Sequence, residues 1–318
     1  MSLSRRRFLA SSSLALAAST FDIRSLLAQA AQAPAGAQGV PATPQTAFTD
    51  IRGTIGYFTG QGGTIGYHIS KAGVVVVDAQ MPATAIICLD GIKQRDGGAP
   101  IDYLVNTHHH ADHTGGNPVF LSSVKKILAH ENVPELQRAA AARAKAARPD
   151  AVAPDIVVPN ALFGKTWREQ VGSDTMALKH YGAAHTKGDA VVTFEKANVV
   201  HMGDLVFNRR HPVIDRPGGA SIAGWIKVLE KAAKDHAKDT IFIFGHAAPK
   251  FGVTGATADL MYQRDYLTAL LEFVREQMKA FKLKDDIVKM TDVLKGFPDH
   301  GPLTERVLGP AYDELATS

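Results

Sequence analysis

The sequence NTHHHADHTGG, residues 106–116, places four histidines and one aspartate within six consecutive positions. It begins where PIDYLVNT, residues 100–107, ends, and the apolar and β-branched side chains of that run predict a strand. Because functional side chains are commonly carried on loops at the ends of a rigid scaffold, this crowding of titratable groups predicts a functional site. On an extended segment, His108 and His110 would lie on one side of the chain, while His109 would point to the other.

Three further residues of the same chemical kind stand at the ends of predicted strands. His185, Asp204 and His246 each follow a run that is typical of a strand. Imidazoles and carboxylates without a thiolate are suited to zinc, and less often to iron or manganese, and they leave a coordination position open for water. The sequence therefore predicts a catalytic metal centre rather than a purely structural one.

The spacing within the cluster indicates two metal ions. His108 and His110 could bind one ion, and Asp112 and His113, where the chain turns toward its glycines, could bind another. Two cations a few ångströms apart need an anionic bridge, and the carboxylate of Asp204 is suited to that role together with water or hydroxide. Two further histidines would complete the coordination spheres: His185 and His246.

The rest of the chain mixes predicted strands and helices. TIGYFTG, GGTIGYHIS and AGVVVVDAQ predict a strand meander with glycine-bearing turns. VPELQRAAAARAKAA and SIAGWIKVLEKAAKD predict helices on the surface of the domain. There is no internal repeat and no obvious linker after residue 48, so the pattern favours one domain of packed sheets with helices outside.

These residues carry a resemblance to a known family. THHHADHTGG holds the His-x-His-x-Asp-His signature of the metallo-β-lactamase superfamily, and AAHTKGD, Gly203-Asp204 and Gly245-His246 are similar to its later metal-binding motifs, in the same order. The resemblance covers roughly residues 50–250. It implies an α/β (α+β, four-layer) fold, namely an αββα sandwich of two mixed β-sheets flanked by helices, with a dinuclear zinc site along one edge of the sheets.

The resemblance also implies a role for each matching position. Asp78, which ends the run VVVVD, resembles an acidic residue that supports the metal loop without binding the metal. Asp112 is implied as the catalytic residue that orients the attacking hydroxide. The positions that match metal ligands form two sets and a bridge: His108, His110 and His185 for the first zinc ion, Asp112, His113 and His246 for the second, and Asp204 between them.

The implied chemistry is hydrolysis by a hydroxide that two Zn²⁺ ions generate near neutral pH, with Fe or Mn as possible replacements. No side-chain nucleophile is needed, and the sequence shows neither a Gly-x-Ser-x-Gly elbow nor a phosphate-binding glycine loop. The expected partner is a small-molecule substrate, and the sequence does not identify the residues that bind it.

The bond that is cleaved is inferred from Asp204. β-Lactamases of the superfamily generally have a cysteine or serine nearby instead of a bridging aspartate, whereas its lactonases and esterase-like hydrolases keep the aspartate. The leading interpretation is therefore a hydrolase of an ester, thioester or lactone. A periplasmic metallo-β-lactamase that hydrolyses β-lactam antibiotics is the alternative. A di-iron redox protein of the same fold is a third interpretation, disfavoured because no flavodoxin-like extension is visible in the sequence.

The first thirty residues predict an export signal. SRRRFL, residues 4–9, is a twin-arginine pattern, and the apolar run that follows is too short to span a bilayer. We therefore expect a twin-arginine signal peptide over residues 1–30, the export machinery as a partner, a periplasmic or secreted protein, and no stable membrane anchor after cleavage. Residues 31–48 predict a disordered linker, and residues 49–318 a single hydrolase domain that ends in a helical tail.

The positive charge lies mainly in the signal peptide. Residues 1–30 account for +3 of the formal net charge of +4, so the remaining chain is close to neutral. This balance predicts no nucleic-acid partner. The single cysteine, Cys88, has apolar neighbours and is expected to be buried and chemically inert.

The remaining polar candidates receive simpler interpretations. His109 is open between support of the ligands and plain exposure. The segment 208–211 could line the substrate entrance, although a solvated loop is the simpler interpretation. Residues 117–175 and 206–224 are expected to supply the loops that shape the pocket. Six histidines are expected to be surface residues or hydrogen-bonded structural residues: His68, His130, His180, His201, His236 and His300.

Overall fold

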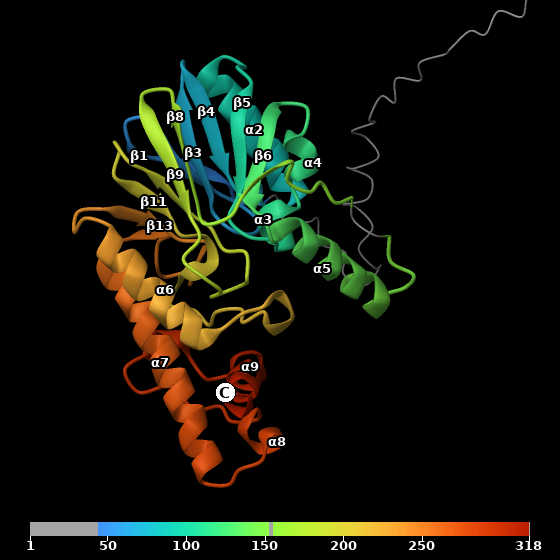
Figure 1. The fold of residues 1–318 in the computed structure, drawn as a ribbon, viewed down its shortest axis with the longest axis vertical. Helices are drawn as coiled ribbons and strands as arrows, with labels where there is room; N and C mark the ends of the chain where they lie inside the picture. Colours follow the sequence, from blue (N-terminus) through green and yellow to red (C-terminus); the bar gives the residue numbers. More distant parts are fainter. Residues whose placement is uncertain (1–43, 153–154, 318) are drawn as a thin grey trace, which may run out of the picture. The chain divides into compact units, whose positions relative to one another are not determined.

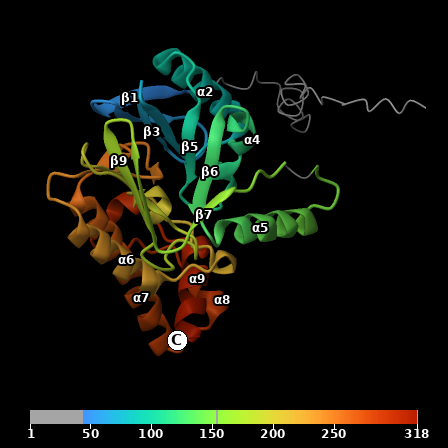
Figure 2. The same cartoon turned by 45° about the horizontal axis from the view of Figure 1, so that its top comes forward.

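A computed structural model describes residues 44–152 and 155–317 of the chain. The predicted signal peptide and all but the last few residues of the predicted linker lie outside these described residues. The domain contains two β-sheets whose outer faces carry helices, as Figures 1 and 2 show from two directions. The first strand begins at Ala47, where the linker was still expected.

The first sheet is mixed. Its strand order follows the chain from β1 to β7, with antiparallel pairs from β1 to β4 and parallel pairs from β4 to β7. The carboxyl ends of β4, β5 and β6 therefore meet at one edge of the sheet. The strands of this sheet are β1 (Ala47–Arg52), β2 (Ile55–Thr59), β3 (Ile65–Ser70), β4 (Gly73–Val77), β5 (Ile101–Asn106), β6 (Val124–His130) and β7 (Ala161–Phe163).

The second sheet has the order β15-β13-β11-β10-β9-β8. Only the pair β11 and β13 is parallel among its described strands, so these two strands also end at a common edge. A short parallel pair, β12 with β14, lies at that edge. The bounds are β8 (Thr166–Val171), β9 (Asp174–Lys179), β10 (Val191–Phe194), β11 (Val199–His201), β12 (Phe207–Asn208), β13 (Ile241–Ile243), β14 (His246–Ala247) and β15 (Thr254–Gly255).

The helices begin and end at residues with capping properties. In α2, a proline occupies the first turn and Gly97 closes the helix in the left-handed conformation. In α6, the Ser221 hydroxyl accepts a hydrogen bond from the Gly224 amide. The helical bounds are α2 (Pro82–Asp96), α3 (Ala111–Thr114), α4 (Asn117–Phe120), α5 (Val133–Ala147), α6 (Ile222–Asp235), α7 (Thr257–Lys279), α8 (Lys284–Ile287) and α9 (Glu305–Ala316), with 3-10 turns η1 (Gly203–Leu205), η2 (Arg216–Gly218) and η3 (Pro298–His300).

Alternation along the strands builds the layers. In β4, Val75 and Val77 enter the core shared by the two sheets, while Val74 and Val76 pack under α2 on the opposite face. The second sheet alternates in the same way, because Val199 faces the shared core and the next residue packs under the helices α6 and α7. Three apolar layers thus separate four structural layers, which confirms the αββα sandwich.

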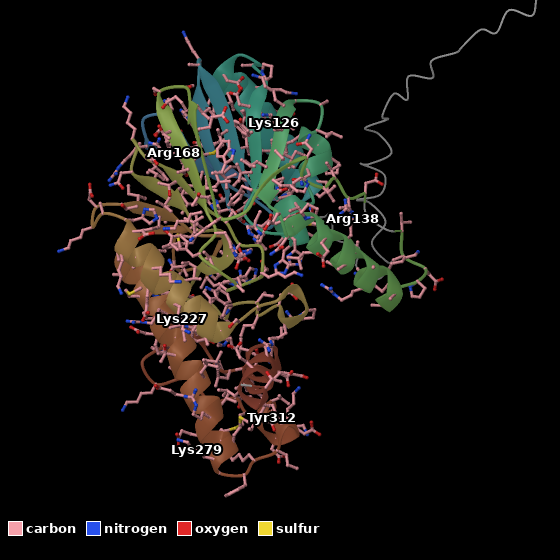
Figure 3. All side chains as sticks on the ribbon, in the orientation of Figure 1. Lys126, Arg138, Arg168, Lys227, Lys279 and Tyr312 are labelled. Atoms are coloured by element: carbon pink, nitrogen blue, oxygen red, sulfur yellow. The ribbon has the colours of Figure 1, made fainter. Side chains whose placement is uncertain are left out.

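The single cysteine is buried, as expected. Cys88 is buried on α2 and its thiol is free. No helix among the described residues is both long and apolar enough to cross a membrane. Each basic side chain that Figure 3 labels lies on a different helix or strand: Lys126 on β6, Arg138 on α5, Arg168 on β8, Lys227 on α6 and Lys279 on α7.

Two histidines contradict the expectation of exposure or hydrogen bonding. His68 and His300 are buried, and neither ring nitrogen of either residue has a hydrogen-bond partner among the described residues. Aromatic packing holds them instead, since His68 meets Phe194 edge-on and His300 stacks on Tyr266 with ring centroids 4.1 Å apart. Burial lowers the pKa of both imidazoles, to about 3 for His300. Both rings are therefore neutral aromatic packing groups.

The C-terminal helix α9, which the sequence patterns did not identify, is joined to α6 by a buried carboxylate. Glu314 accepts hydrogen bonds from the amides of Ile222 (2.7 Å) and Ala223 (2.8 Å) in the first turn of α6. Its Oε2 also accepts a bond from Arg216 at 3.1 Å. A carboxylate at a helix N-terminus satisfies amides that have no partner within the helix. Glu314 therefore connects the end of the chain to the second sheet's helical layer.

We expect Glu314→Ala to lower the free energy of unfolding by roughly 1–3 kcal/mol, because two amides at the start of α6 lose their acceptors. Glu314→Gln keeps one acceptor oxygen and should lose less. Denaturant unfolding of both variants and the unchanged chain measures the difference. Equal unfolding free energies for all three proteins would show that this contact does not hold α9 in place.

Candidate metal centre

Asp78 shapes the loop that carries the histidine cluster. Its backbone has a φ of 66°, a strained conformation for a residue with a side chain, and the carboxylate is completely buried. Oδ1 accepts a hydrogen bond from the Thr107 amide at 2.7 Å, and Oδ2 accepts from the Thr107 hydroxyl at 2.8 Å and lies 2.7 Å from Nδ1 of His113. Asp78 thus fixes both ends of the loop, in agreement with its expected supporting role.

One cluster of candidate ligands is formed by His108, His110, His185 and Asp204, whose ligand atoms all lie within 4.8 Å of one another. Nδ1 of His110 is 3.0 Å from Nε2 of His185. Oδ2 of Asp204 is 3.9 Å from Nε2 of His108 and 3.6 Å from Nε2 of His185. The loop after β5, the loop before β10 and the turn after β11 are therefore brought to one point.

The second cluster lies on the other side of Asp204. Asp112, His113 and His246 also place their ligand atoms within 4.8 Å of one another. Oδ1 of Asp204 is 3.0 Å from Nε2 of His113, and Oδ2 is 3.3 Å from Nε2 of His246. All seven predicted ligands are thus brought together, in the two predicted groups, with Asp204 in contact with both.

The donor atoms fit divalent cations. Nε2 of His108 is buried and has no hydrogen-bond partner among the described residues, although it faces the Asp204 carboxylate. Nε2 of His113 and Nε2 of His246 face each other at 3.4 Å. Buried polar atoms are nearly always satisfied, and nitrogen lone pairs that converge on one point are satisfied by a shared cation. The residues present therefore fit metal ions on both sides of Asp204.

Burial lowers the pKa of two histidines in the first cluster, which favours their neutral, metal-binding form. Burial, together with the neighbouring His113, lowers the pKa of His108 well below its usual value, and burial beside His110 lowers that of His185 to about 3. In the second cluster, burial likewise opposes ionisation of Asp112, yet its contacts with His113 and His246 outweigh burial and bring its pKa to about 2. Neutral imidazoles and ionised carboxylates are the protonation states that bind metals.

In the second cluster, the neighbouring carboxylates raise the pKa of two histidines. Burial alone would lower the pKa of His113, but the carboxylates of Asp204 and Asp78 raise it well above the usual value. The pKa of His246 rises to about 9 because the same Asp204 charge, with Asp112, outweighs burial. These two imidazoles must release a proton when a cation binds, so metal binding in this cluster competes with protons.

Asp215 is a member of the site that the sequence patterns did not reveal. Its Oδ2 lies 2.9 Å from Nε2 of His110 and 3.2 Å from Nε2 of His109, while Oδ1 accepts a hydrogen bond from the Gly218 amide at 3.0 Å. A carboxylate on the far nitrogen of a ligand fixes which nitrogen faces the metal, here Nδ1 of His110. His109 is buried against the same carboxylate and is therefore a supporting residue rather than an exposed one.

Two glycines are required by the close approach of the ligands. A Cβ atom at Gly245 would lie 2.0 Å from Oδ1 of Asp204, and one at Gly63 would lie 2.0 Å from Cε1 of His113. Any side chain at either position would push a candidate ligand out of the cluster. Gly245 belongs to the Gly-His pair seen in the sequence, whereas Gly63 lies in a turn between strands with nothing in the sequence to connect it to His113.

A cavity of about 350 Å³ opens onto this centre. Its lining includes three residues from the expected segment 206–224, whereas the other expected segment, 117–175, contributes none of the described lining residues. The cavity is lined by His110, Ala111, Asp112, Asp204, Phe207, Arg210, Val213 and His246.

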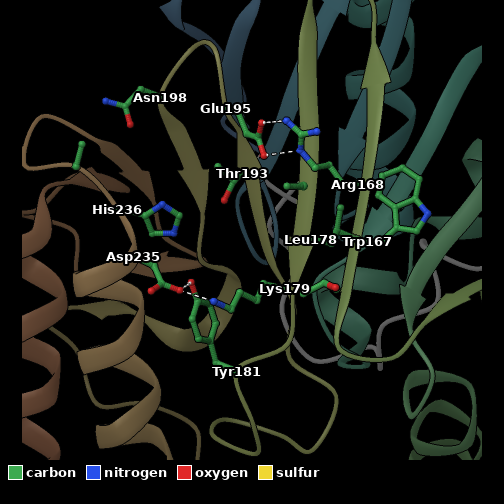
Figure 4. A pocket seen from close by; sticks show the side chains of 13 residues that line it. Trp167, Arg168, Leu178, Lys179, Tyr181, Thr193, Glu195, Asn198, Asp235 and His236 are labelled. Carbon is green, nitrogen blue, oxygen red and sulfur yellow. Dashed lines mark hydrogen bonds and ion pairs between the residues drawn. The ribbon is translucent and has the colours of Figure 1, made fainter.

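A larger groove of about 630 Å³ lies elsewhere, over β8, β9 and β10 beside the end of α6 (Figure 4). Its charges are paired, Arg168 with Glu195 and Lys179 with Asp235. None of the metal-centre residues lines it. The smaller cavity is therefore the candidate active site.

Comparisons with known proteins agree with this geometry. Residues 63–246 match the model of the family described as the metallo-beta-lactamase superfamily. The metallo-beta-lactamase IND-1 of Chryseobacterium indologenes is 27% identical over 183 residues, which cover 57% of this chain and 70% of that protein.

Two solved structures show the same fold. A metallo-beta-lactamase from Pontibacter korlensis superposes with a TM-score of 0.56 at 18% identity, covering 70% of this chain and 99% of that one. The stereoselective inverting sec-alkylsulfatase Pisa1 from Pseudomonas sp. superposes with a TM-score of 0.64 at 17% identity over 84% of this chain, which spans only 50% of the sulfatase's length.

We expect Asp215→Asn to weaken zinc binding at the His108, His110 and His185 cluster by about 10–100-fold, because His110 loses the carboxylate that orients it. Binding at the second cluster should change less. Competition with a chelating indicator would resolve the two steps. The control is Asp90→Asn, which removes the same charge from an exposed position on α2. Equal affinities in Asp215→Asn and the control would contradict this role of Asp215.

Proposed function

The chain belongs to the metallo-beta-lactamase superfamily and is a metal-dependent hydrolase, and from that premise we propose that it uses two zinc ions to hydrolyse an ester, thioester or lactone. The ligands are proposed as in the two clusters: His108, His110 and His185 for one ion, Asp112, His113 and His246 for the other, and Asp204 as the bridge.

The contacts of Asp204 carry this proposal. The carboxylate is buried, and it lies within 3.9 Å of imidazole nitrogens from both clusters. A carboxylate can contact two metal ions at once, and Oδ2 of Asp204 lies 3.6 Å from Nε2 of His185 and 3.3 Å from Nε2 of His246, which belong to different clusters. Since a cysteine or serine near this position is typical of the superfamily's β-lactamases, an aspartate here favours its ester and lactone hydrolases.

Two residues of the cavity can assist the hydrolysis that bound zinc ions would catalyse. Bound zinc ions would supply an acidified water molecule and a Lewis acid for the oxygen of the scissile bond. Asp112 is ionised, lines the cavity and has a partly exposed side chain, so it can accept a hydrogen bond from the attacking water and orient it. Phe207 stacks on the His246 ring with centroids 5.2 Å apart and covers that face of the ligand.

A β-lactamase is the second candidate, and the similarity to IND-1 favours it. That similarity covers 57% of this chain at 27% identity, so it supports the shared reaction class more strongly than the shared substrate. A di-iron redox protein is the third candidate, and metal analysis separates it from both hydrolases.

The proposal includes an exported enzyme, periplasmic or secreted, because residues 1–30 carry the twin-arginine pattern. A fusion of these residues to a reporter that matures only when folded before export would test it. Loss of export on changing Arg5, Arg6 and Arg7 to lysine is the expected result, and unchanged export through the general secretion route would refute it.

The first experiment combines metal analysis with a hydrolysis screen of one lactone, one aryl ester, one thioester, one cephalosporin and one secondary alkyl sulfate. Two zinc ions per chain with preference for the lactone or the esters is the expected result. Efficient cephalosporin turnover would favour the β-lactamase instead. Two iron ions without hydrolysis would contradict both hydrolases.

We expect Asp112→Asn to lower kcat by about 10²–10⁴-fold on the preferred substrate, because the amide cannot accept a proton from the attacking water. Zinc content measured on the same sample separates this effect from loss of the metal. The Asp90→Asn variant again controls for the charge. Turnover equal to that of the unchanged enzyme, at equal zinc content, would remove Asp112 from the mechanism.

A further inference from the structure

The mouth loop, residues 207–213, contributes one cationic side chain to the cavity. Arg210 is exposed and lines the cavity together with ligands of both clusters. Its guanidinium has no hydrogen bond or ion pair with any other described residue. The other non-ligand side chains of the lining, those of Ala111, Phe207 and Val213, are apolar. The entrance to the metal centre therefore presents a single unpaired positive charge beside an apolar wall.

Both neighbours of Arg210 are held away from the cavity. Arg209 adopts a φ of 57°, which turns the chain at a residue that rarely accepts this conformation. Its guanidinium lies 2.8 Å from Asp259 and 3.8 Å from the centre of the Tyr262 ring, both on α7. The ion pair and the cation–π contact stabilise a strained residue at the rim of the site.

His211 fixes the other side of the turn. Because the carbonyl oxygen of Pro302 can only accept, Nε2 of His211 donates to it at 2.8 Å. Nδ1 then accepts a hydrogen bond from the Tyr266 hydroxyl at 2.6 Å. Arg209 is held by α7, and His211 is held by α7 and by Pro302. Arg210, between them, lines the cavity. The segment 208–211 is thus a positioned part of the entrance and not the solvated loop that was the simpler expectation.

We propose that Arg210 is a specificity-determining residue and that the substrate is an ester or lactone with an oxyanion group on the part of the molecule that reaches the mouth loop. An arginine that is free of partners forms paired, charge-assisted hydrogen bonds with a carboxylate, sulfonate or phosphate. The small cavity and its apolar wall leave room for a short aliphatic chain between that group and the scissile bond. This inference rests on the proposed ester or lactone hydrolysis.

The test uses esters that differ only in the distal group. The zinc-loaded enzyme is given 4-nitrophenyl hexanoate, mono-4-nitrophenyl adipate and the 4-nitrophenyl ester of 5-sulfopentanoate. We expect kcat/KM to be about tenfold or more higher for the anionic esters, mainly through a lower KM, because the charged group binds away from the reacting carbonyl. The ratio of carboxylate to sulfonate turnover shows which oxyanion the entrance prefers.

Three variants test whether Arg210 causes the preference for anionic esters. Arg210→Gln should reduce the ratio of anionic to neutral turnover toward one. His211→Ala should reduce it partly, and His211→Gln, which can still donate to Pro302, should restore part of it. Arg275→Gln is the matched control, because it removes an exposed arginine charge from α7 outside the cavity lining and should leave the ratio unchanged.

Titration of the zinc-loaded protein with adipate and with hexanoate provides a readout that does not depend on turnover. Tighter adipate binding that Arg210→Gln abolishes would support the anion site even if no ester is cleaved, in which case only the proposed reaction fails. Equal kcat/KM for the neutral and anionic esters, or a preference retained in Arg210→Gln, would overturn the inference while leaving ester hydrolysis intact.

Discussion

The contact of one buried carboxylate with imidazoles from separate parts of the chain is the constraint on which the rest of this structure depends. Asp204 can meet His108, His185 and His246 only if the two sheets place their strand ends along a common edge. The parallel pairs around β5 and between β11 and β13 provide that edge. The glycine before His246 keeps the carboxylate free to approach.

The C-terminal helices hold the mouth loop at the entrance of the cavity. Glu314 on α9 is bonded to the start of α6, and residues of α7 hold the mouth loop through Arg209 and His211. The helices therefore do more than cover the outer face of the second sheet. They determine which side chain of the loop faces the cavity, and so they connect the packing of the domain with the choice of substrate.

Local patterns in the sequence predicted the candidate metal ligands and a domain of packed sheets with outer helices, and the resemblance to a known family implied the αββα arrangement of those layers. The His-x-His-x-Asp-His spacing and alternation such as that of Val74 to Val77 are visible in short segments. Asp215 was missed because its partner, His110, lies far away in the sequence and no spacing joins them. The role of Arg210 depends on contacts of its neighbours with α7, and those contacts form only in the folded domain.

The central claim is that Asp204 bridges two metal ions, and a crystal structure of the zinc-loaded protein with anomalous data at the zinc edge tests it most directly. The account predicts two anomalous peaks a few ångströms apart, one between His108, His110 and His185 and one between Asp112, His113 and His246, with the Asp204 carboxylate bonded to both. A single peak, or two peaks with Asp204 bonded to only one of them, would contradict it.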